Sequence, residues 1–217
     1  MKIALITGIK KEFDKKLASA FARENYRVFA MGSEKIDGIT LLCEDQKEAA
    51  AAIQKDAGLI DIYIDVSDER NEADSFNVRS GINDKIMREL YDTNVIRPMS
   101  MLEAFFPLLE AGSAKRICFL TSAQASINEA RGTEGYGYTM AKAALHNFLQ
   151  ITRNALAPKG FTIRAYDPMQ QEVSPEASAE AAFNYFTRRR GIERDDSMRD
   201  DETNLVFRDA YGRQHAW

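Results

Sequence analysis

Short apolar runs alternate with longer segments of helical period along the chain. Six runs of four to six residues are mostly apolar, a pattern typical of strands buried on both faces of a parallel sheet. We expect strands at Lys2–Thr7, Arg27–Met31, Thr40–Cys43, Asp61–Val66, Arg116–Thr121 and Thr162–Tyr166.

Between these runs, apolar residues recur at helical spacing. Helices are predicted at Phe13–Glu24, Gln46–Asp56, Asn83–Leu109 and Tyr138–Ala157, with a further one starting near Ser174. Pro98 should bend or break the long third helix. The alternation predicts an α/β fold: a doubly wound parallel sheet in three layers, α/β/α, forming a single domain over residues 1–217.

The region before the C-terminus is more polar. Residues 192–203 are rich in both acidic and basic side chains and are predicted to form a surface loop. A short last strand is expected at Asn204–Arg208. The terminal Trp217 could dock on a neighbouring subunit or fray, and the sequence leaves both possibilities open.

The composition excludes some classes of binding partner. The 217 residues include 29 Lys and Arg against 33 Asp and Glu, a net charge of −4, which disfavours nucleic acid and anionic membranes as general partners. No apolar run is long enough for a transmembrane helix, and the charged residues after the first strand do not fit a secretion signal. We therefore expect a cytoplasmic protein.

The metal-binding residue types are sparse. Cys43 and Cys118 both fall in strand-like runs, where a buried thiol is expected, and no disulfide framework is present. His146 and His215 stand apart from any cysteine or carboxylate at ligand spacing. No metal site is predicted.

One pair of residues indicates acid–base chemistry. Tyr138 and Lys142 are four apart on a predicted helix and therefore share a face. A phenol has a pKa of about 10, and a nearby ammonium lowers it toward the working range. Such a pair also arises by chance on amphipathic helices, so its context decides its meaning.

The context is a set of polar residues at strand ends. Ser122 follows the fifth predicted strand, and Thr7-Gly8 and Asp167-Pro168 follow the first and the sixth. In a doubly wound sheet the ligand site lies at the carboxyl ends of the strands, so these groups should converge.

The ordered set Asn94, Ser122, Tyr138 and Lys142 resembles the short-chain dehydrogenase/reductase family, whose fold is Rossmann-like. The resemblance runs from Ile3 to about Phe186. It also includes Thr7-Gly8, Pro98 and Pro107, Lys159-Gly160, and Asp167-Pro168.

The resemblance implies a role for each residue. Tyr138 would be the general acid that protonates a carbonyl oxygen, and Ser122 would position that oxygen, with Ser126 as a competing choice. Lys142 would hold the nicotinamide ribose and lower the pKa of Tyr138, and Asn94 would support a relay water. Hydride would come from NAD(P)H, because no side chain can supply it.

The family's glycine-rich phosphate loop is degenerate here. Glu12 and Asp14 stand at the second and third glycine positions, where they suit the first turn of a helix and repel a diphosphate. Lys10 and Lys11 could offset this repulsion. The small residues that the family carries after the fourth strand are replaced by Asp65-Val66-Ser67-Asp68.

Cofactor contacts are nevertheless predicted along the groove. The cofactor could be NADP or NAD, or none; Ser33 and Lys35 favour the phosphate of NADP, whereas Glu34 opposes it. The predicted cofactor-binding residues are Thr7, Gly8, Ile9, Lys10, Lys11, Gly32, Ser33 and Pro168.

Three functions fit these observations. The first is an NAD(P)H-dependent oxidoreductase acting on a small carbonyl or alcohol substrate. The second is a protein of the same fold that has lost dinucleotide binding and acts as a non-catalytic binding or regulatory module. The third keeps the enzyme but uses a smaller nucleotide, or acid–base chemistry by Tyr138 without hydride transfer. A homodimer or homotetramer paired through the helices at Asn83–Leu109 and Tyr138–Ala157 is expected.

Overall fold

One eight-stranded sheet organises the chain, in the order β3-β2-β1-β4-β5-β6-β7-β8. The structure, a computed structural model, describes residues 1–76, 78–79, 81–188, 201 and 204–217. Neighbouring strands from β3 to β7 pair in parallel, and β8 pairs antiparallel with β7. The strands are β1 (Lys2–Ile9), β2 (Tyr26–Gly32), β3 (Thr40–Leu42), β4 (Ile62–Asp65), β5 (Arg116–Leu120), β6 (Thr162–Asp167), β7 (Phe207–Asp209) and β8 (Gln214–His215).

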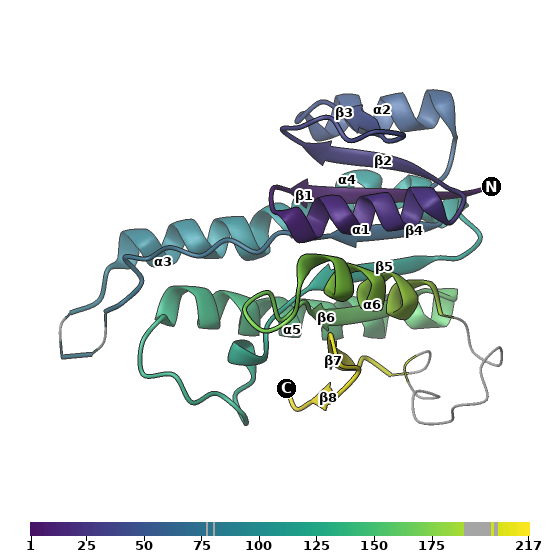
Figure 1. The fold of residues 1–217 in the computed structure, drawn as a ribbon. Coiled ribbons are helices and arrows are strands. Elements are labelled where there is room, and N and C mark those ends of the chain that lie inside the picture. Colours follow the sequence, from purple (N-terminus) through teal and green to yellow (C-terminus); the bar gives the residue numbers. More distant parts are fainter. Residues whose placement is uncertain (77, 80, 189–200, 202–203) are drawn as a thin grey trace.

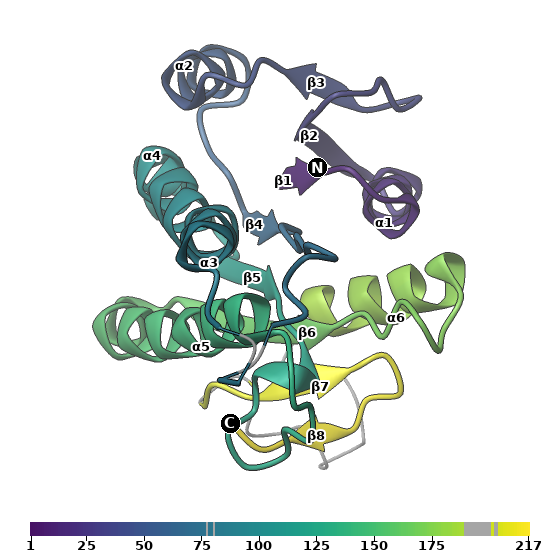
Figure 2. The same ribbon diagram turned by 90° about the vertical axis from the view of Figure 1, so that its left-hand side faces the viewer.

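Helices cover both faces of the sheet (Figures 1 and 2). One face carries α1 (Glu12–Arg23) and α6 (Pro175–Thr187), and the other carries α2 (Gln46–Asp56), α4 (Arg97–Ala111) and α5 (Tyr136–Leu156). α3 (Asp84–Tyr91) extends beyond the sheet on the side where the strands end (Figure 1). The predicted fold class, a doubly wound three-layer α/β/α architecture, is therefore confirmed.

Alternating side chains of each strand supply two cores. Leu5 of β1 packs with Leu102 of α4 and Leu149 of α5. Its neighbour Ile6 packs on the opposite face with Phe21 of α1. Both sides of the strand are thus withdrawn from water, which is why the strand sequences are apolar without alternation.

The predicted long helix is widened rather than broken. A π-helical turn, Asp92–Ile96, joins α3 to α4, and Pro98 lies at the start of α4. Proline has no N–H to donate to the carbonyl one turn earlier, so the preceding turn adopts a wider hydrogen-bonding pattern. This turn carries Asn94, which is completely buried.

Two predictions need correction. Cys43 lies just beyond β3 and is exposed, because β3 is only three residues long, whereas Cys118 is buried in β5 as expected. The predicted surface loop at 192–203 lies outside the described residues except for Asp201. That residue is buried, not solvated, and binds Arg208 through two nitrogen–oxygen contacts of 2.6 and 2.9 Å.

The C-terminus folds back onto its own chain. The Trp217 ring packs edge-on against His146 with centroids 4.7 Å apart, and its backbone oxygen accepts a hydrogen bond from Asn128 at 2.7 Å. Trp217 therefore docks on its own chain, which is neither of the two possibilities left open by the sequence. Burial lowers the pKa of His146 to about 4, so this imidazole is neutral at pH 7.

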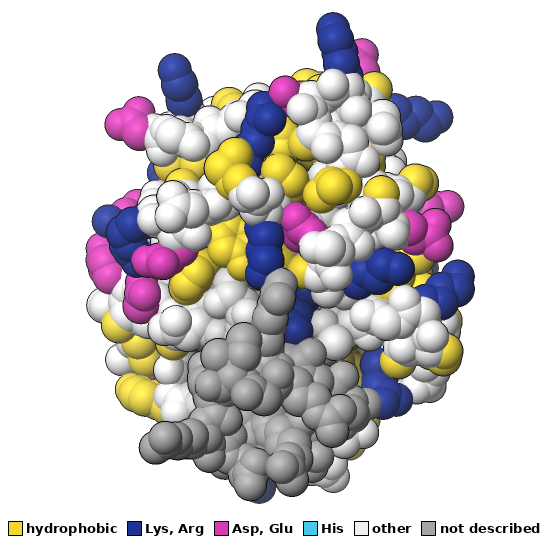
Figure 3. All heavy atoms as spheres, turned by 90° about the vertical axis from the view of Figure 1, so that its right-hand side faces the viewer, with side chains coloured by type: hydrophobic (Ala, Val, Ile, Leu, Met, Phe, Trp, Pro, Cys, Tyr) yellow, Lys and Arg dark blue, Asp and Glu magenta, His cyan; other side chains and the backbone are white. Residues whose placement is uncertain are grey.

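One face of the molecule carries charges of both signs. On the face where the strands begin, basic and acidic side chains are interspersed over the upper part (Figure 3). No helix among the described residues is long and apolar enough to cross a bilayer. Met99 of α4 and Met140 of α5 are exposed, and the homo-oligomer paired through these helices stays a prediction.

The tail contact predicts a measurable loss of stability. Trp217→Ala should lower the free energy of unfolding by about 1–2 kcal/mol, because the ring is only partly buried. Denaturant unfolding followed by circular dichroism measures the change. Tyr211→Ala, at a residue 60% exposed in the same tail, is the matched control and should change stability little. Equal stability of Trp217→Ala and wild type would contradict the docked position.

Candidate active site

Tyr138 lies in the first turn of α5, and this helix begins on the side of the sheet where the parallel strands end (Figure 1). The carboxylate of Asp74 accepts hydrogen bonds from the backbone nitrogens of Gly137 and Tyr138 at 3.0 and 2.8 Å. A Cβ at Gly137 would lie 2.8 Å from Leu90 Cδ1 and 3.0 Å from Asp74 Oδ1, so the glycine leaves room for the close approach of the carboxylate. An acidic group at a helix N-terminus is favourable, so Asp74 orients the tyrosine.

The hydroxyl of Tyr138 points to a carboxylate of the same chain. Tyr138 Oη donates to Asp68 Oδ1 at 2.6 Å. Lys11 Nζ lies 2.7 Å from Asp68 Oδ2, and Lys142 Nζ lies 3.5 Å from Oδ1. Burial acts to raise the pKa of Asp68, but Lys142, Lys11 and the hydrogen bonds outweigh it and hold the pKa well below its usual value. Asp68 is therefore a permanent carboxylate.

The electrostatics of Tyr138 differ from the prediction. Burial, followed by the negative charge of Asp68, raises the pKa of Tyr138 well above its ordinary value, while Arg70 and Ser122 act to lower it. The net shift is thus opposite to the predicted lowering, and the ammonium of Lys142 lies 3.5 Å from Asp68 Oδ1. In this conformation Tyr138 is a neutral proton donor.

Lys142 and Asn94 also bind partners other than those expected. Lys142 Nζ donates to the backbone oxygens of Ser67 and Leu120 at 2.7 and 3.2 Å. The Asn94 amide accepts from the Glu69 nitrogen at 3.1 Å and donates to the Glu69 oxygen at 3.0 Å. These contacts hold the loop after β4, and the roles in holding a ribose and a relay water stay predictions.

The two candidate serines have different surroundings. Ser122 lies beside Tyr138, where its hydroxyl acts to lower the tyrosine pKa, and it also accepts from Gln124 nitrogen at 3.3 Å. Ser126 is completely buried and accepts from Glu129 nitrogen at 3.1 Å, which holds the start of the following loop. Of the two, Ser122 is the one placed to meet an oxygen at Tyr138.

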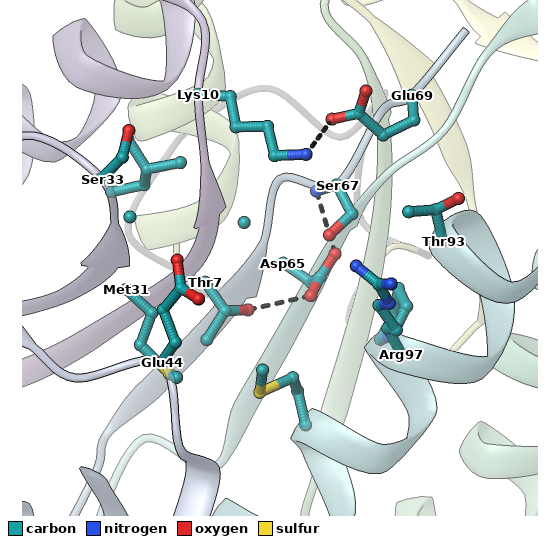
Figure 4. A pocket seen from close by; sticks show the side chains of 15 residues that line it. Thr7, Lys10, Met31, Ser33, Glu44, Asp65, Ser67, Glu69, Thr93 and Arg97 are labelled. Carbon is teal, nitrogen blue, oxygen red and sulfur yellow. Dashed lines mark hydrogen bonds and ion pairs between the residues drawn. The ribbon is translucent and has the colours of Figure 1, made fainter. Parts of the chain in front are cut away.

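A cavity of about 370 Å³ lies beside this group (Figure 4). It is bordered by Thr7, Gly8, Ile9, Lys10, Gly32 and Ser33, six of the predicted cofactor-binding residues. Thr7 itself is buried and donates to Asp65 Oδ2 at 2.8 Å (Figure 4). Gly8 has φ +82° and would place a Cβ 2.5 Å from Ser67 Oγ, so only glycine fits where the turn meets the loop after β4.

The N-terminus of α1 already holds an anion. Asp14 Oδ2 accepts from the backbone nitrogens of Lys10 and Lys11 at 2.8 and 2.7 Å, as expected for a capping residue. These are the donors that a helix N-terminus would otherwise offer to a phosphate. Burial, partly opposed by these two hydrogen bonds, raises the pKa of Asp14 to about 6.

A second cavity, of about 250 Å³, lies on the other side of Asp68. It is bordered by Ser122, Tyr138 and Pro168, and also by Lys11 and Asp68. A dinucleotide crossing this edge would need both cavities. The first carries six of the predicted cofactor-binding residues, whereas the Asp68 carboxylate lies between Tyr138 and Lys142, the residues predicted to meet the carbonyl oxygen and the nicotinamide ribose. In this conformation the residues do not fit the nicotinamide end.

Comparison with known proteins places this arrangement in a family. A family model described as short chain dehydrogenase matches residues 2–180. The chain belongs to the short chain dehydrogenase family. This dehydrogenase-family chain is 30% identical over 125 residues to an uncharacterized oxidoreductase of Schizosaccharomyces pombe, covering 58% of this chain and 48% of the relative. It is 33% identical over 78 residues to one of Saccharomyces cerevisiae, covering 36% and 30%. The matches thus span about half of the relatives' length or less.

Solved structures support the fold of this family member. The carbonyl reductase Sniffer of Drosophila melanogaster superposes with a TM-score of 0.82 at 15% identity, covering 100% of both chains. A carbonyl reductase from Pseudomonas aeruginosa in complex with NADP gives 0.77 at 20% identity, again covering 100% of both chains. At these identities the likeness concerns the fold alone.

Sequence reasoning missed three residues of this site. Asp68 was noticed only as a departure from small residues, and Asp74 and Arg70 carried no signal because they lie in an irregular loop. The Arg70 guanidinium lies 3.9 Å from the Tyr138 ring centroid and donates to its hydroxyl at 3.0 Å. Long-range contacts of this kind have no sequence spacing to mark them.

The Asp14 carboxyl predicts a pH effect on stability. Its pKa rises from 3.8 to about 6 on folding, so between these values the folded state binds the proton more tightly and acidification stabilises it. From about pH 7.5 to about pH 5, wild type should gain about 1 kcal/mol relative to Asp14→Asn, which lacks this proton. Chemical denaturation at both pH values measures the difference. An unchanged difference would contradict the raised pKa.

Proposed function

We propose that this protein is a nicotinamide-dependent oxidoreductase that interconverts a small carbonyl compound and its alcohol. The observation that carries the proposal is the meeting of Tyr138, Ser122 and Lys142 at the carboxyl edge of the sheet, beside a groove. Membership of the short chain dehydrogenase family and relatives named oxidoreductases support it at a coarse level.

Each residue would contribute through its present position. Tyr138, neutral and hydrogen-bonded, would give its proton to a carbonyl oxygen, and Ser122 would donate a second hydrogen bond to that oxygen. Arg70, on the hydroxyl of Tyr138, would stabilise negative charge that develops there. Lys142 would keep the ends of β4 and β5 in register beneath the reacting groups.

NADP is the form of cofactor that we propose. Ser33 borders the cavity where a ribose phosphate would lie. Glu34, which would oppose a phosphate, is paired with Lys15 at 2.5 Å, and this pairing offsets its charge. Since Asp68 would fill the nicotinamide side, the cofactor would bind only after that side chain has moved.

Tyr138→Phe tests the assignment of the acid. Consumption of NADPH, followed by absorbance over a panel of aldehydes and ketones, should fall by about 100-fold or more, because the variant lacks the proton. NADPH binding, measured by fluorescence, should persist. Tyr136→Phe, at the other tyrosine of the same helical turn, is the matched control and should keep its turnover. Undiminished turnover in Tyr138→Phe would refute the assignment.

A second candidate function is a binding module that does not use a dinucleotide. Two observations favour it: Asp14 occupies the donors at the start of α1, and Asp68 occupies Tyr138. Thermal unfolding with saturating NADPH and NADH separates the candidates. A bound cofactor at about 100 times its Kd stabilises by about 2.7 kcal/mol, whereas the module predicts no shift with either cofactor.

A further inference from the structure

We infer that Asp68 is a specificity-determining residue of the groove: its carboxylate is an internal ligand that competes with the nicotinamide end of a dinucleotide for Tyr138. The inference rests on the proposed function and names how the same site selects its nucleotide. It predicts that ligands confined to the adenosine side bind freely, whereas a complete dinucleotide binds only to the minority of molecules in which Asp68 has moved.

The groove is divided by two neighbouring ion pairs. Lys10 Nζ lies 2.6 Å from Glu69 Oε1, and Lys11 Nζ lies 2.7 Å from Asp68 Oδ2. Each pair joins the turn after β1 to the loop after β4 (Figure 4 shows the outer pair, Lys10 and Glu69). The cavity of about 370 Å³ includes both residues of the outer pair in its lining, and the cavity of about 250 Å³ includes both residues of the inner pair. The outer pair thus borders the first cavity, and the inner pair, formed by the adjacent residues of the chain, borders the second.

The inner pair is the effective barrier. The outer side chains, Lys10 and Glu69, are 59% and 33% exposed, so water and salt screen their attraction. Asp68 is 7% exposed and faces Lys142, which is completely buried. Opening the inner pair by moving Asp68 would also leave the buried ammonium of Lys142 without its nearest carboxylate. This is far more costly than breaking a surface pair.

We expect the barrier to open by rotation of the Asp68 side chain rather than by movement of its loop. Asn94 holds the backbone of Glu69 through both its nitrogen and its oxygen, so the loop that carries Asp68 is anchored. Among the described residues, the carboxylate of Asp68 contacts groups that a ribose could also engage: the hydroxyl of Tyr138 and two ammonium groups. Because Asp68 and a bound ribose would use the same donors, the two would compete for them.

The test compares a whole and a truncated ligand on the full-length chain. Asp68→Gly removes the internal ligand, and the affinity for NADPH, measured by nicotinamide fluorescence, should rise by roughly tenfold or more because the competent state becomes dominant. Affinity for 2′-phospho-ADP-ribose, which lacks the nicotinamide, should stay within about twofold of wild type by calorimetry.

Two further variants guard against a folding artefact. Asp68→Asn keeps the size of the side chain and removes its charge; it should bind NADPH several-fold more tightly than wild type, and its thermal unfolding reports whether the fold is kept. Glu180→Gln breaks an exposed ion pair with Arg23 that lies outside the lining of both cavities, and it is the control, for which both affinities should remain unchanged.

The outcomes separate the inference from the proposed function. If wild type and both Asp68 variants bind NADPH equally well, the inference is overturned and the proposed function stands. If none of them binds NADPH or NADH, both are overturned. A parallel gain in affinity for NADPH and 2′-phospho-ADP-ribose would also overturn the inference, since it would place the effect of Asp68 on the adenosine side.

Discussion

The Asp68 carboxylate is the charge around which the edge of the sheet is organised. It is nearly buried, and the surrounding groups compensate for its loss of hydration: the hydroxyl of Tyr138, the ammonium of Lys11 and, further away, that of Lys142. Removing any one of these would leave the carboxylate or a lysine uncompensated in a poorly hydrated place. The positions of Tyr138 and Lys142 are therefore set as much by this internal ion cluster as by the helix that carries them.

The same principle acts at the start of α1. Asp14 supplies the negative charge that a helix N-terminus attracts, and the donors that would face a diphosphate are satisfied from within the chain. The groove thus keeps the backbone shape of its family, including the glycine after β1, while hydrogen-bond donors along it are satisfied by carboxylates of the same chain. Fold and ligand chemistry have separated here, because the fold depends on apolar strands and the ligand chemistry on a few side chains.

The architecture could be predicted from the sequence because it follows from local patterns. The α2 helix begins and ends at the predicted residues, Gln46 and Asp56, and β1, β5 and β6 differ from the prediction by at most two residues at an end. Parallel strands end at one edge of a sheet, and this rule predicts that Ser122 lies close to Tyr138 and Lys142. The contacts of Asp68 could not be predicted, since they join residues 57 and 70 positions apart. Cys43 was misplaced because no local signal marks a three-residue edge strand.

Lys142 joins the ends of two strands that are far apart in the sequence. Its ammonium donates to the carbonyl of Ser67, beyond β4, and to that of Leu120, at the end of β5. The lysine is thus a crosslink of the sheet as well as a neighbour of the tyrosine. A variant that lacks the Lys142 amine would lose both of these hydrogen bonds. Its inactivity would therefore report the loss of this crosslink as well as the loss of any chemical role of the amine.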